Sequence, residues 1–558
     1  MRRFSTVLVG DAAVTVACGQ KLLAAGHDVL GVVTGDGRVA GWAAGNRIAC
    51  CFLAAQEGLT GGDVETLVAG KPFDLLFSVH NLRLLPGELL AAARVAAINY
   101  HDAPLPRYAG LHATSWAIEQ GERLHGIVWH RMTPEVDAGE LLVERALAIA
   151  PDETAWTLNI RCTEAAIEGF DELLHRLARG TLDPRPQNRA QRTYFPGWRL
   201  PSPGCVVPWY DSAERISSFV RGLDFGAADN PLGIPKLVAP AGIFLTPQVA
   251  ILATRSGALP GTVLGCGAPG LEIATATSDV RILELRTLDG AAVAADAALE
   301  RLGLALGDRL AATAPAADLL AVRERSWRRH EAKWLHTLVG LAPIVPPGFE
   351  AESAGSPAIP ASIELDLPAS APAETESLIA AILLALGEEI GQPFDVAFGE
   401  PQLRAEIVAH GWQDLIVARP PLHVPFRAGI ALQELVHSLN AERTRQRERG
   451  TYVADLPLRS RRLAAAAHVS RAALGPALAF DLLAAGEAAP ALPESSSIRL
   501  AIAVDPDLRR VTLRGWSTPG KDPLSAFSHR FVARLGDGLG RRPTPARLRP
   551  LNRAGAVG

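Results

Sequence analysis

Short runs of β-branched residues alternate with segments of helical periodicity over the first hundred residues, and this alternation constrains the fold more than any other feature. The runs predict strands at residues 6–9, 29–34, 75–79 and 96–101. Apolar residues at helical spacing fill residues 14–25, and Gly26 follows as a helix stop. This order is typical of βαβ units, so the sequence predicts an α/β fold with a parallel, Rossmann-like sheet.

The turn after the first strand carries no G-x-G-x-x-G sequence, so we expect no dinucleotide site. Further along, the pattern predicts a helix at 115–120, a strand at 126–132 and a long amphipathic helix at 154–178. The apolar side of that helix is expected to hold the residues Ile160, Ala165, Ile167, Phe170 and Leu173. The first domain is predicted to end at residue 180.

The chain has 558 residues, several times the size of one domain, so more than one core is expected. Residues 181–208 repeat proline and polar residues and read as a linker. Residues 209–325 begin with a helix (212–223) and continue with short strands at 243–245, 250–253, 261–264, 271–275 and 281–285, which suggests a small OB-like β-barrel. A helical stretch is predicted at 295–338. Residues 326–372 hold the end of this stretch and a proline-rich linker, and residues 373–558 are predicted to form an α+β lobe with a loose tail.

The composition restricts the classes of protein to which this chain can belong. The net charge is −4, with 55 basic and 59 acidic residues, which disfavours nonspecific nucleic-acid binding. The six cysteines show no C-x-x-C spacing and fit a reducing compartment. The longest apolar run is far shorter than a membrane span needs, and the first residues do not resemble a signal peptide. We therefore expect a cytoplasmic protein without a membrane segment or a metal site.

The stretch from Ile98 to Gly110 holds the strongest chemical signal. Asn99 and His101 are two residues apart on a predicted strand, so both side chains point to the same face. They lie at the carboxyl edge of the sheet, where open α/β sheets bind ligands. Asp137 follows the strand at 126–132 in a D-x-G turn. Taken singly, the Asn and His of an N-x-H at a strand end are most often polar side chains whose hydrogen bonds are satisfied within the protein, and a D-x-G is most often a turn.

Together with its surroundings, this region resembles the 10-formyltetrahydrofolate-dependent formyltransferases, above all methionyl-tRNA formyltransferase. Four elements occur in the order of that family: the N-x-H strand, the L-P-R-Y-x-G loop (105–110), the W-A-I-x-x-G-E helix (116–122) and the D-x-G turn. Residues 186–196 resemble the family's linker, and residues 221–224 and 260–264 resemble motifs of its C-terminal barrel. The resemblance spans residues 4 to 290.

The resemblance implies that Asn99, His101 and Asp137 are the catalytic residues. Such a set suits formyl transfer, because an amide and an imidazolium stabilise a tetrahedral oxyanion, and a carboxylate orients the histidine and relays a proton. It also implies that the segment after the third predicted strand binds the pterin of 10-formyltetrahydrofolate. The residues expected to bind this cofactor are Ser78, Val79, His80, Leu82, Leu84, Leu85 and Pro86, together with Asp137. A strand followed by a helix-starting proline explains the same segment nearly as well.

Three further residues are candidates for acceptor contact. Arg107 and Tyr108 lie in the loop after the catalytic strand, where they are placed to steer an anionic acceptor, although an exposed arginine is usually only solvated. His130 ends the strand that leads to Asp137 and is expected either to face the acceptor or to be a half-buried structural histidine. Initiator tRNA is a poor candidate acceptor, because the segment 35–51 is short and not basic and Lys236 is the only lysine between Lys71 and Lys333.

From Glu331 onward the chain resembles the second lobe of a nonribosomal peptide synthetase condensation domain. The resemblance rests on the W-L-x-x-L opening, the apolar helix at 378–386 and the segments 420–427 and 449–459. No H-H-x-x-x-D-G occurs, so condensation chemistry is not expected. The resemblance implies a docking platform for a carrier-protein-bound aminoacyl group or a synthetase module; packing onto the catalytic half is the alternative.

The sequence thus predicts an enzyme that transfers a formyl group from 10-formyltetrahydrofolate to an amine or hydroxylamine. The expected acceptor is an amino acid or a carrier-bound aminoacyl group in nonribosomal peptide or siderophore biosynthesis. The alternatives are a 10-formyltetrahydrofolate hydrolase, a methionyl-tRNA formyltransferase and a non-catalytic synthetase scaffold. No membrane partner is expected.

Overall fold

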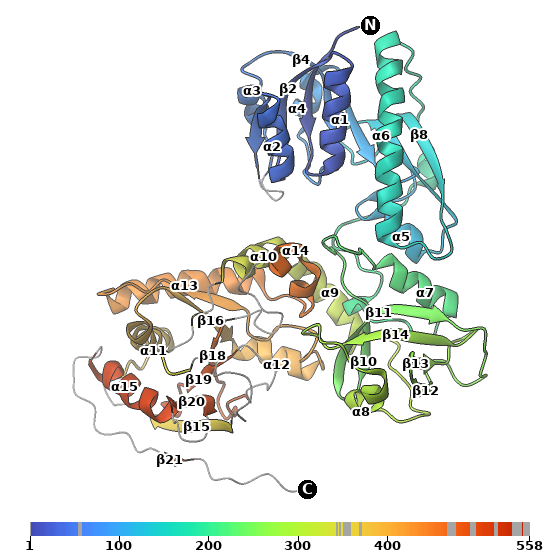
Figure 1. Cartoon of the computed structure of the whole chain (residues 1–558). Helices are drawn as coiled ribbons and strands as arrows, with labels where there is room; N and C mark the ends of the chain where they lie inside the picture. The colour runs from blue at the N-terminus through green and yellow to red at the C-terminus, as the bar shows by residue number, and fades with distance from the viewer. Residues whose placement is uncertain are drawn as a thin grey trace.

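Three sheets organise the molecule, and each anchors one unit of the chain (Figure 1). The structure is a computed structural model. It describes residues 2–53, 58–341, 344, 347–349, 359–367, 371–465, 476–490, 498–517, 523–537 and 549–550. Within them, no helix is long and apolar enough to cross a membrane.

The first unit is built on a seven-stranded sheet in the order β3-β2-β1-β4-β5-β7-β8. Its parallel part consists of β1 (Ser5–Val9), β2 (Asp28–Thr34), β3 (Ala49–Phe52), β4 (Phe73–Ser78) and β5 (Ala93–His101). Two antiparallel strands, β7 (Leu124–Arg131) and β8 (Leu141–Ala148), extend it beyond β5. The predicted strands and the Rossmann-like parallel sheet are confirmed. The strands β3 and β8 were not predicted, because β3 is short and mostly exposed and β8 carries Glu144 and Arg145 in its middle.

Helices cover the sheet, and those near 14–25, 115–120 and 154–178 were predicted. They are α1 (Ala13–Ala24), α2 (Gly37–Gly45), α3 (Gly61–Leu67), α4 (Gly87–Ala92), α5 (Ala113–Glu119) and α6 (Ala155–Arg179). The α6 helix begins after Thr154, whose hydroxyl accepts from the Thr157 N–H, and ends at Gly180 with a left-handed backbone. Phe170 and Leu173 of α6 are buried as expected, but Ile160 is 40% exposed, so its predicted place on the apolar side was wrong.

The linker returns to the first unit before it enters the second. It contains two 3-10 turns, η1 (Arg189–Gln191) and η2 (Pro203–Cys205), and a short strand, β9 (Tyr194–Phe195). β9 pairs in parallel with β6 (Ala109–Gly110), which lies in the loop after β5. The linker is therefore part of the scaffold around that loop.

The second unit is a helix packed on a five-stranded antiparallel sheet. The helix α7 (Ala213–Gly222) precedes β10 (Lys236–Ala239), β11 (Gly242–Ile251), β12 (Val263–Gly267), β13 (Gly270–Ile273) and β14 (Val280–Arg286). The sheet order β10-β11-β14-β13-β12 leaves β10 and β12 at its edges, so closure into an OB-like barrel stays a prediction. The two strands predicted at 243–245 and 250–253 are one continuous strand, β11.

Several helices follow where one helical stretch was predicted. They are η3 (Ala295–Ala297), α8 (Ala298–Leu302), α9 (Ala317–Arg328) and α10 (Glu331–Gly340). The left-handed backbone of Gly303 ends α8, and residues 303–316, which include Pro315, separate it from α9.

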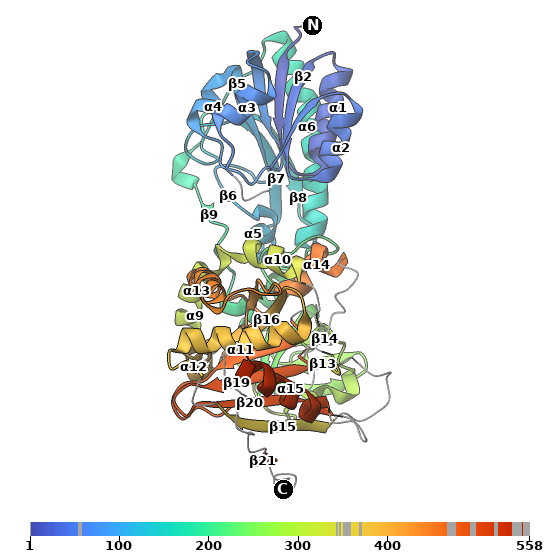
Figure 2. The same cartoon turned by 90° about the vertical axis from the view of Figure 1, so that its left-hand side faces the viewer.

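The third unit is a mixed seven-stranded sheet in the order β17-β16-β18-β19-β20-β15-β21, with helices packed on it (Figure 2). Its strands are β15 (Ile359–Asp366), β16 (Phe394–Gly399), β17 (Pro421–Val424), β18 (Leu478–Leu482), β19 (Leu500–Asp505), β20 (Arg510–Ser517) and β21 (Arg549–Pro550). Its helices are α11 (Thr375–Ile390), α12 (Pro401–Ala409), α13 (Leu432–Arg449), α14 (Arg461–Ala465) and α15 (Pro523–Asp537), with a 3-10 turn, η4 (Leu456–Arg459).

This architecture is α+β as predicted, and the apolar helix at 378–386 lies within α11. One prediction was wrong: β15 lies in the segment expected to be a proline-rich linker, where it pairs along its whole length with β20. Most of the tail expected to be loose lies outside the described residues.

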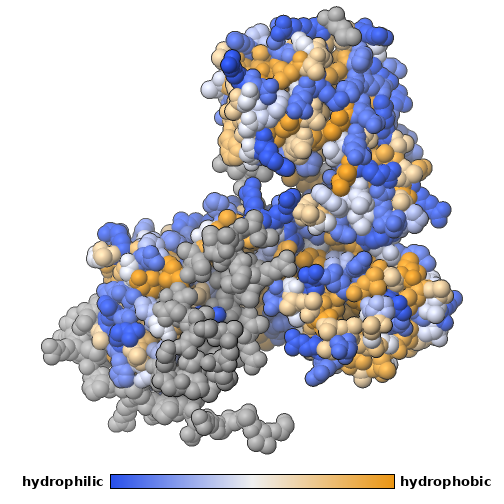
Figure 3. All heavy atoms as spheres, in the orientation of Figure 1, coloured by the Kyte–Doolittle hydropathy of each residue, from blue (hydrophilic) through white to orange (hydrophobic). Residues whose placement is uncertain are grey.

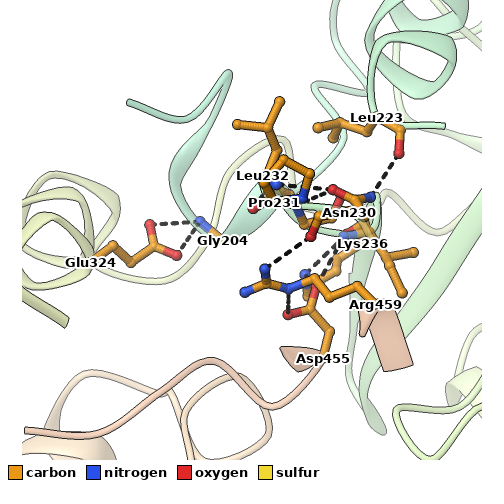
Figure 4. A network of polar contacts seen from close by, with 12 residues as sticks. Gly204, Leu223, Asn230, Pro231, Leu232, Lys236, Glu324, Asp455 and Arg459 are labelled. Carbon is orange, nitrogen blue, oxygen red and sulfur yellow. Dashed lines mark hydrogen bonds and ion pairs between the residues drawn. The ribbon is translucent and has the colours of Figure 1, made fainter. Parts of the chain in front are cut away.

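A buried ionic joint fixes the third unit to the second (Figure 4). The Lys236 ammonium of β10 contacts the Asp455 carboxylate at 2.5 Å, and both side chains are almost fully buried. Arg459 donates to Asp455 Oδ1 at 3.2 Å and to the Asn230 carbonyl at 3.1 Å. An apolar cluster that joins Val206 and other residues of the second unit to the third continues the contact. The two units therefore form one packed body.

Candidate active site

Asn99 and His101 lie at the end of β5, on the same face of the strand, as the period of two requires. The His101 ring is buried, and its Nε2 lies 2.9 Å from the Tyr108 carbonyl oxygen. Because a carbonyl only accepts, Nε2 carries a hydrogen and donates it. This leaves Nδ1 as the His101 nitrogen that can take up a proton.

His130 stands directly opposite Asn99 on the neighbouring strand β7. Its Nε2 lies 3.1 Å from Asn99 Nδ2, and its Nδ1 lies 2.8 Å from the Arg131 carbonyl. The carbonyl again requires Nδ1 to be the donor, so Nε2 of the neutral ring accepts from the Asn99 amide. The side chain is 2% exposed. His130 therefore belongs to the same cluster as the predicted catalytic residues and holds the Asn99 amide in place.

Asp137 completes the cluster from the turn after β7. Its Oδ2 lies 3.7 Å from His101 Nδ1, and its Oδ1 lies 3.5 Å from His130 Nε2. Burial by itself raises the pKa of the Asp137 carboxyl, but His101, His130 and the Gly110 N–H outweigh burial and hold that pKa below its usual value. Asp137 is therefore an anion at neutral pH, placed to stabilise a positive charge on His101.

Backbone contacts hold the Asp137 turn. Asp137 has a left-handed backbone with φ of 52°, and its carboxylate accepts from the Gly110 N–H at 2.9 Å. Gln187, in the linker, donates to the carbonyls of Asp137 and Gly139 at 2.9 and 2.7 Å. A Cβ on Gly139 would stand 1.9 Å from the Arg131 carbonyl oxygen, so only glycine fits there.

The loop after β5 carries Arg107 and Tyr108, the two residues expected to contact an acceptor. Tyr108 is 5% exposed, its ring stacks on Phe195, and its hydroxyl donates to Glu122 at 2.8 Å. Its side chain is therefore buried against Phe195 and Glu122, and the part of Tyr108 that reaches the cluster is its carbonyl. Arg107 forms an ion pair with the same Glu122, which offsets the charge expected to steer an anionic acceptor.

The segment from Ser78 to Pro86 lies at the same edge of the sheet, beyond β4. Within it, Ser78 and Val79 are buried, His80 and the side chains of Leu82 and Leu84 are exposed, and Leu85 and Pro86 are partly exposed. The Val79 side chain has no free surface for a ligand, whereas Leu82 and Leu84 are 57% and 77% exposed. Exposed leucines on a loop beside the cluster are available to contact a flat ring.

An arginine that sequence reasoning missed anchors this segment. Arg83 is buried and forms a salt bridge to Asp11 at 2.7 Å, after β1. Its second terminal nitrogen donates to the Leu53 carbonyl at 2.8 Å. No motif marks Arg83 in the sequence, because the pairing depends on the order β1-β4 in the sheet.

Within the described residues, no group of three or more His, Cys, Asp or Glu side chains is placed to hold a metal ion.

Residues 54–174 match the formyl transferase family. This stretch contains Asn99, His101, His130 and Asp137. This part of the chain is therefore similar to formyl transferase domains.

Several solved structures show a more distant likeness. A variant of HypX from Aquifex aeolicus is 18% identical with a TM-score of 0.38, and the match covers 54% of this chain and 49% of HypX, about half of its length. The N-formyltransferase from Helicobacter canadensis, in complex with folinic acid and dTDP-3-aminofucose, is 14% identical with a TM-score of 0.39. The match covers 50% of this chain and 98% of that protein. A sugar N-formyltransferase from Shewanella is 17% identical with a TM-score of 0.34, and the match covers 43% of this chain and 94% of that protein.

Proposed function

We propose that this protein transfers the formyl group of 10-formyltetrahydrofolate to a primary amine, with Asn99, His101 and Asp137 as catalytic residues and His130 as their positioning partner. The observation that carries the proposal is their convergence at the carboxyl edge of the sheet, inside the segment that matches the family. The acceptor that we propose is an amino acid or a carrier-bound aminoacyl group.

The chemistry follows from the hydrogen positions. The acceptor nitrogen attacks the formyl carbon, a C–N bond forms, and the carbonyl oxygen becomes an oxyanion. One N–H of the Asn99 amide is engaged by His130, and its second N–H is left to donate to the oxyanion. Such a donor typically stabilises the transition state by about 2.7–4 kcal/mol.

His101 and Asp137 handle the proton. Nδ1 of neutral His101 accepts the proton that the attacking amine loses, and the Asp137 carboxylate 3.7 Å away stabilises the imidazolium. When the intermediate collapses, the bond between the formyl carbon and the folate nitrogen breaks. That nitrogen regains a proton, and tetrahydrofolate leaves.

The donor is expected to bind along the segment Ser78 to Pro86. Backbone groups of this segment and the exposed Leu82 and Leu84 lie at the strand edge that the cluster occupies. Arg83 and Asp11 hold the segment against the end of β1. The loop is thus anchored before any ligand arrives.

Release of tetrahydrofolate from 10-formyltetrahydrofolate, followed by absorbance with and without a panel of amines, tests the proposal. Amine-dependent release, with a mass gain of one formyl group on the amine, is the expected result. Release without an amine would instead identify a hydrolase, in which water replaces the amine. Formylation of initiator methionyl-tRNA would identify a methionyl-tRNA formyltransferase. The absence of both tetrahydrofolate release and donor binding would favour the non-catalytic synthetase scaffold.

A further inference from the structure

The linker runs along the catalytic cluster before it leaves the first unit. Arg185 exchanges two backbone hydrogen bonds with Leu141, the first residue of β8, at 2.8 and 2.9 Å. Further along, Phe195 of β9 stacks on Trp116 of α5, with ring centroids 4.7 Å apart. Figure 3 shows that the surface is hollowed beneath the first unit, and the linker crosses to the second unit beside α5 (Figure 1). Residues 185–195, which we call the strap, are therefore fastened to the first unit at both ends.

Side chains of the strap hold the turn that carries Asp137. Gln187 Nε2 donates to the carbonyls of Asp137 and Gly139 at 2.9 and 2.7 Å. The Arg192 guanidinium donates to the Val136 carbonyl at 2.8 Å. The backbone of Asp137 is left-handed, a conformation that a residue with a Cβ keeps only where its surroundings impose it. The two side chains of the strap supply that restraint, so they determine where the Asp137 carboxylate stands.

The strap also holds the loop that carries Tyr108. The Tyr108 N–H donates to the Thr193 hydroxyl at 2.7 Å, and the Ala109 N–H donates to the Thr193 carbonyl at 3.0 Å. Tyr108 has a left-handed backbone as well, with φ of 60°, and its ring stacks on Phe195. Its carbonyl accepts from His101 Nε2 and so determines which nitrogen of that ring carries the hydrogen. Thr193 therefore acts on His101 through one intervening residue.

These two sets of contacts meet at Gly110. Its N–H donates to the Asp137 carboxylate at 2.9 Å. A Cβ on Gly110 would stand 2.3 Å from the Phe195 carbonyl oxygen, so only glycine lets the strap approach this closely. The next N–H along the loop, that of Leu111, donates to the same Phe195 carbonyl at 2.9 Å. The strap, the loop after β5 and the Asp137 turn thus form one hydrogen-bonded unit.

We propose that Gln187 and Thr193 are positioning residues of formyl transfer, which hold Asp137 and His101 in the geometry that the reaction requires. This inference rests on the proposed function and extends its machinery from the first sheet into the linker. Both residues act through the cluster, so their loss should lower kcat and leave KM nearly unchanged. A reacting group displaced by about 1 Å can cost on the order of a hundredfold in rate, so the few hydrogen bonds of the strap are sufficient to control turnover.

Substitutions in the strap test this role. Thr193→Val keeps the shape of the side chain and removes the hydroxyl that accepts from Tyr108, and Gln187→Leu removes both donated hydrogen bonds. We expect kcat to fall about tenfold or more in each variant, with KM for donor and amine within about twofold of wild type. Thr193→Ser should recover most of the rate, because it restores the hydroxyl. Thr181→Val and Gln191→Leu, at exposed positions of the same linker, are the matched controls.

Amide hydrogen exchange, followed by mass spectrometry, reports on the strap without any substrate. In the wild type the N–H groups of residues 108–111 are all engaged, by Thr193, Asp137 and Phe195. We expect these amides to exchange about tenfold faster or more in Thr193→Val than in the wild type or in Thr181→Val. Exchange in β2, which lies elsewhere in the sheet, should not change and so shows that the fold is intact.

The two measurements separate this inference from the proposed function. Unchanged exchange in Thr193→Val, or faster exchange with an unchanged kcat, overturns the positioning role. A fall in kcat that an equal rise in KM accompanies, or that the control variants share, overturns it as well, because the strap would then act on binding or on the whole fold. If the wild type transfers formyl to no amine while residues 108–111 still exchange faster in Thr193→Val, that result counts against the proposed reaction alone.

Discussion

Asn99 and His130 face each other across two antiparallel strands, with the Asn99 amide nitrogen 3.1 Å from His130 Nε2. His130 also lies 3.5 Å from Asp137. One histidine thus contacts the group expected to bind the oxyanion and the group expected to stabilise the imidazolium. Its effect on the reaction is expected to pass through both partners.

Replacing His130 by phenylalanine keeps the ring volume and removes both nitrogens. We expect kcat to fall about tenfold or more, equivalent to about 1.4 kcal/mol of barrier, with little change in KM for the donor. The pH profile of kcat should also shift, because Asp137 loses a neighbour that holds its pKa down. His175→Phe, on the exposed side of α6, is the control. An unchanged rate and pH profile in His130→Phe would remove His130 from the mechanism.

Arg83 is predicted to control donor binding through the loop that it anchors. Arg83→Met leaves Asp11 without its salt bridge and loosens the segment from Ser78 to Pro86. We expect the Kd for folinic acid to rise about tenfold, or about 1.4 kcal/mol, and Arg83→Lys to recover part of the loss. Arg38→Met, at an exposed ion pair, should bind normally. Normal binding by Arg83→Met would show that the loop does not depend on this anchor.

Glu324 is predicted to make stability depend on pH near neutrality. Burial raises the pKa of this carboxyl to about 7, although its acceptance from the Gly204 N–H acts in the opposite direction (Figure 4). Because the folded pKa exceeds the unfolded one, about 4.3, the folded state binds more protons between these values, and stability falls as pH rises through this window. Glu324→Gln should therefore gain stability relative to wild type from pH 4 to pH 8.

Denaturant unfolding at a series of pH values measures the Glu324 effect. Glu300→Gln, an exposed position on α8, is the control and should follow the wild type. A constant difference between Glu324→Gln and wild type across this range would contradict the prediction.

The buried Lys236–Asp455 pair is predicted to contribute more to the free energy of unfolding than an exposed ion pair does. Lys236→Met leaves the buried Asp455 carboxylate with Arg459 as its remaining cation. We expect a loss of about 3–5 kcal/mol in the free energy of unfolding. Lys21→Met, at the half-exposed Lys21–Asp171 pair, should cost less than about 1 kcal/mol. Comparable losses in both variants would show that burial does not distinguish the pairs.

Local patterns predicted the parallel sheet and the set of catalytic candidates. The period of two alone places Asn99 and His101 on one face, and the D-x-G turn after the next strand brings Asp137 to the same edge. The class of enzyme followed from the resemblance of this short region, and the family match of residues 54–174 supports it. The roles of these residues stay predictions that the variants above test.

Features that depend on pairing between distant segments could not be predicted. His130 belongs to the cluster because β5 pairs with β7 in a register that places His130 opposite Asn99. Arg83 and Tyr108 likewise depend on partners, Asp11 and Glu122, that no local pattern connects to them. The strand β15 was missed because its ladder with β20 joins segments about 150 residues apart, which no local window contains.

The ionic joint at Asp455 also determines how this chain can be cut. A shortened protein that ends near residue 325 would keep Lys236 in its core position but lose the carboxylate that neutralises it. It would also expose apolar residues such as Val206 and Ile243 that the third unit covers. A shortened protein should therefore not end between Lys236 and Asp455, because both partners of the joint have to be on the same polypeptide.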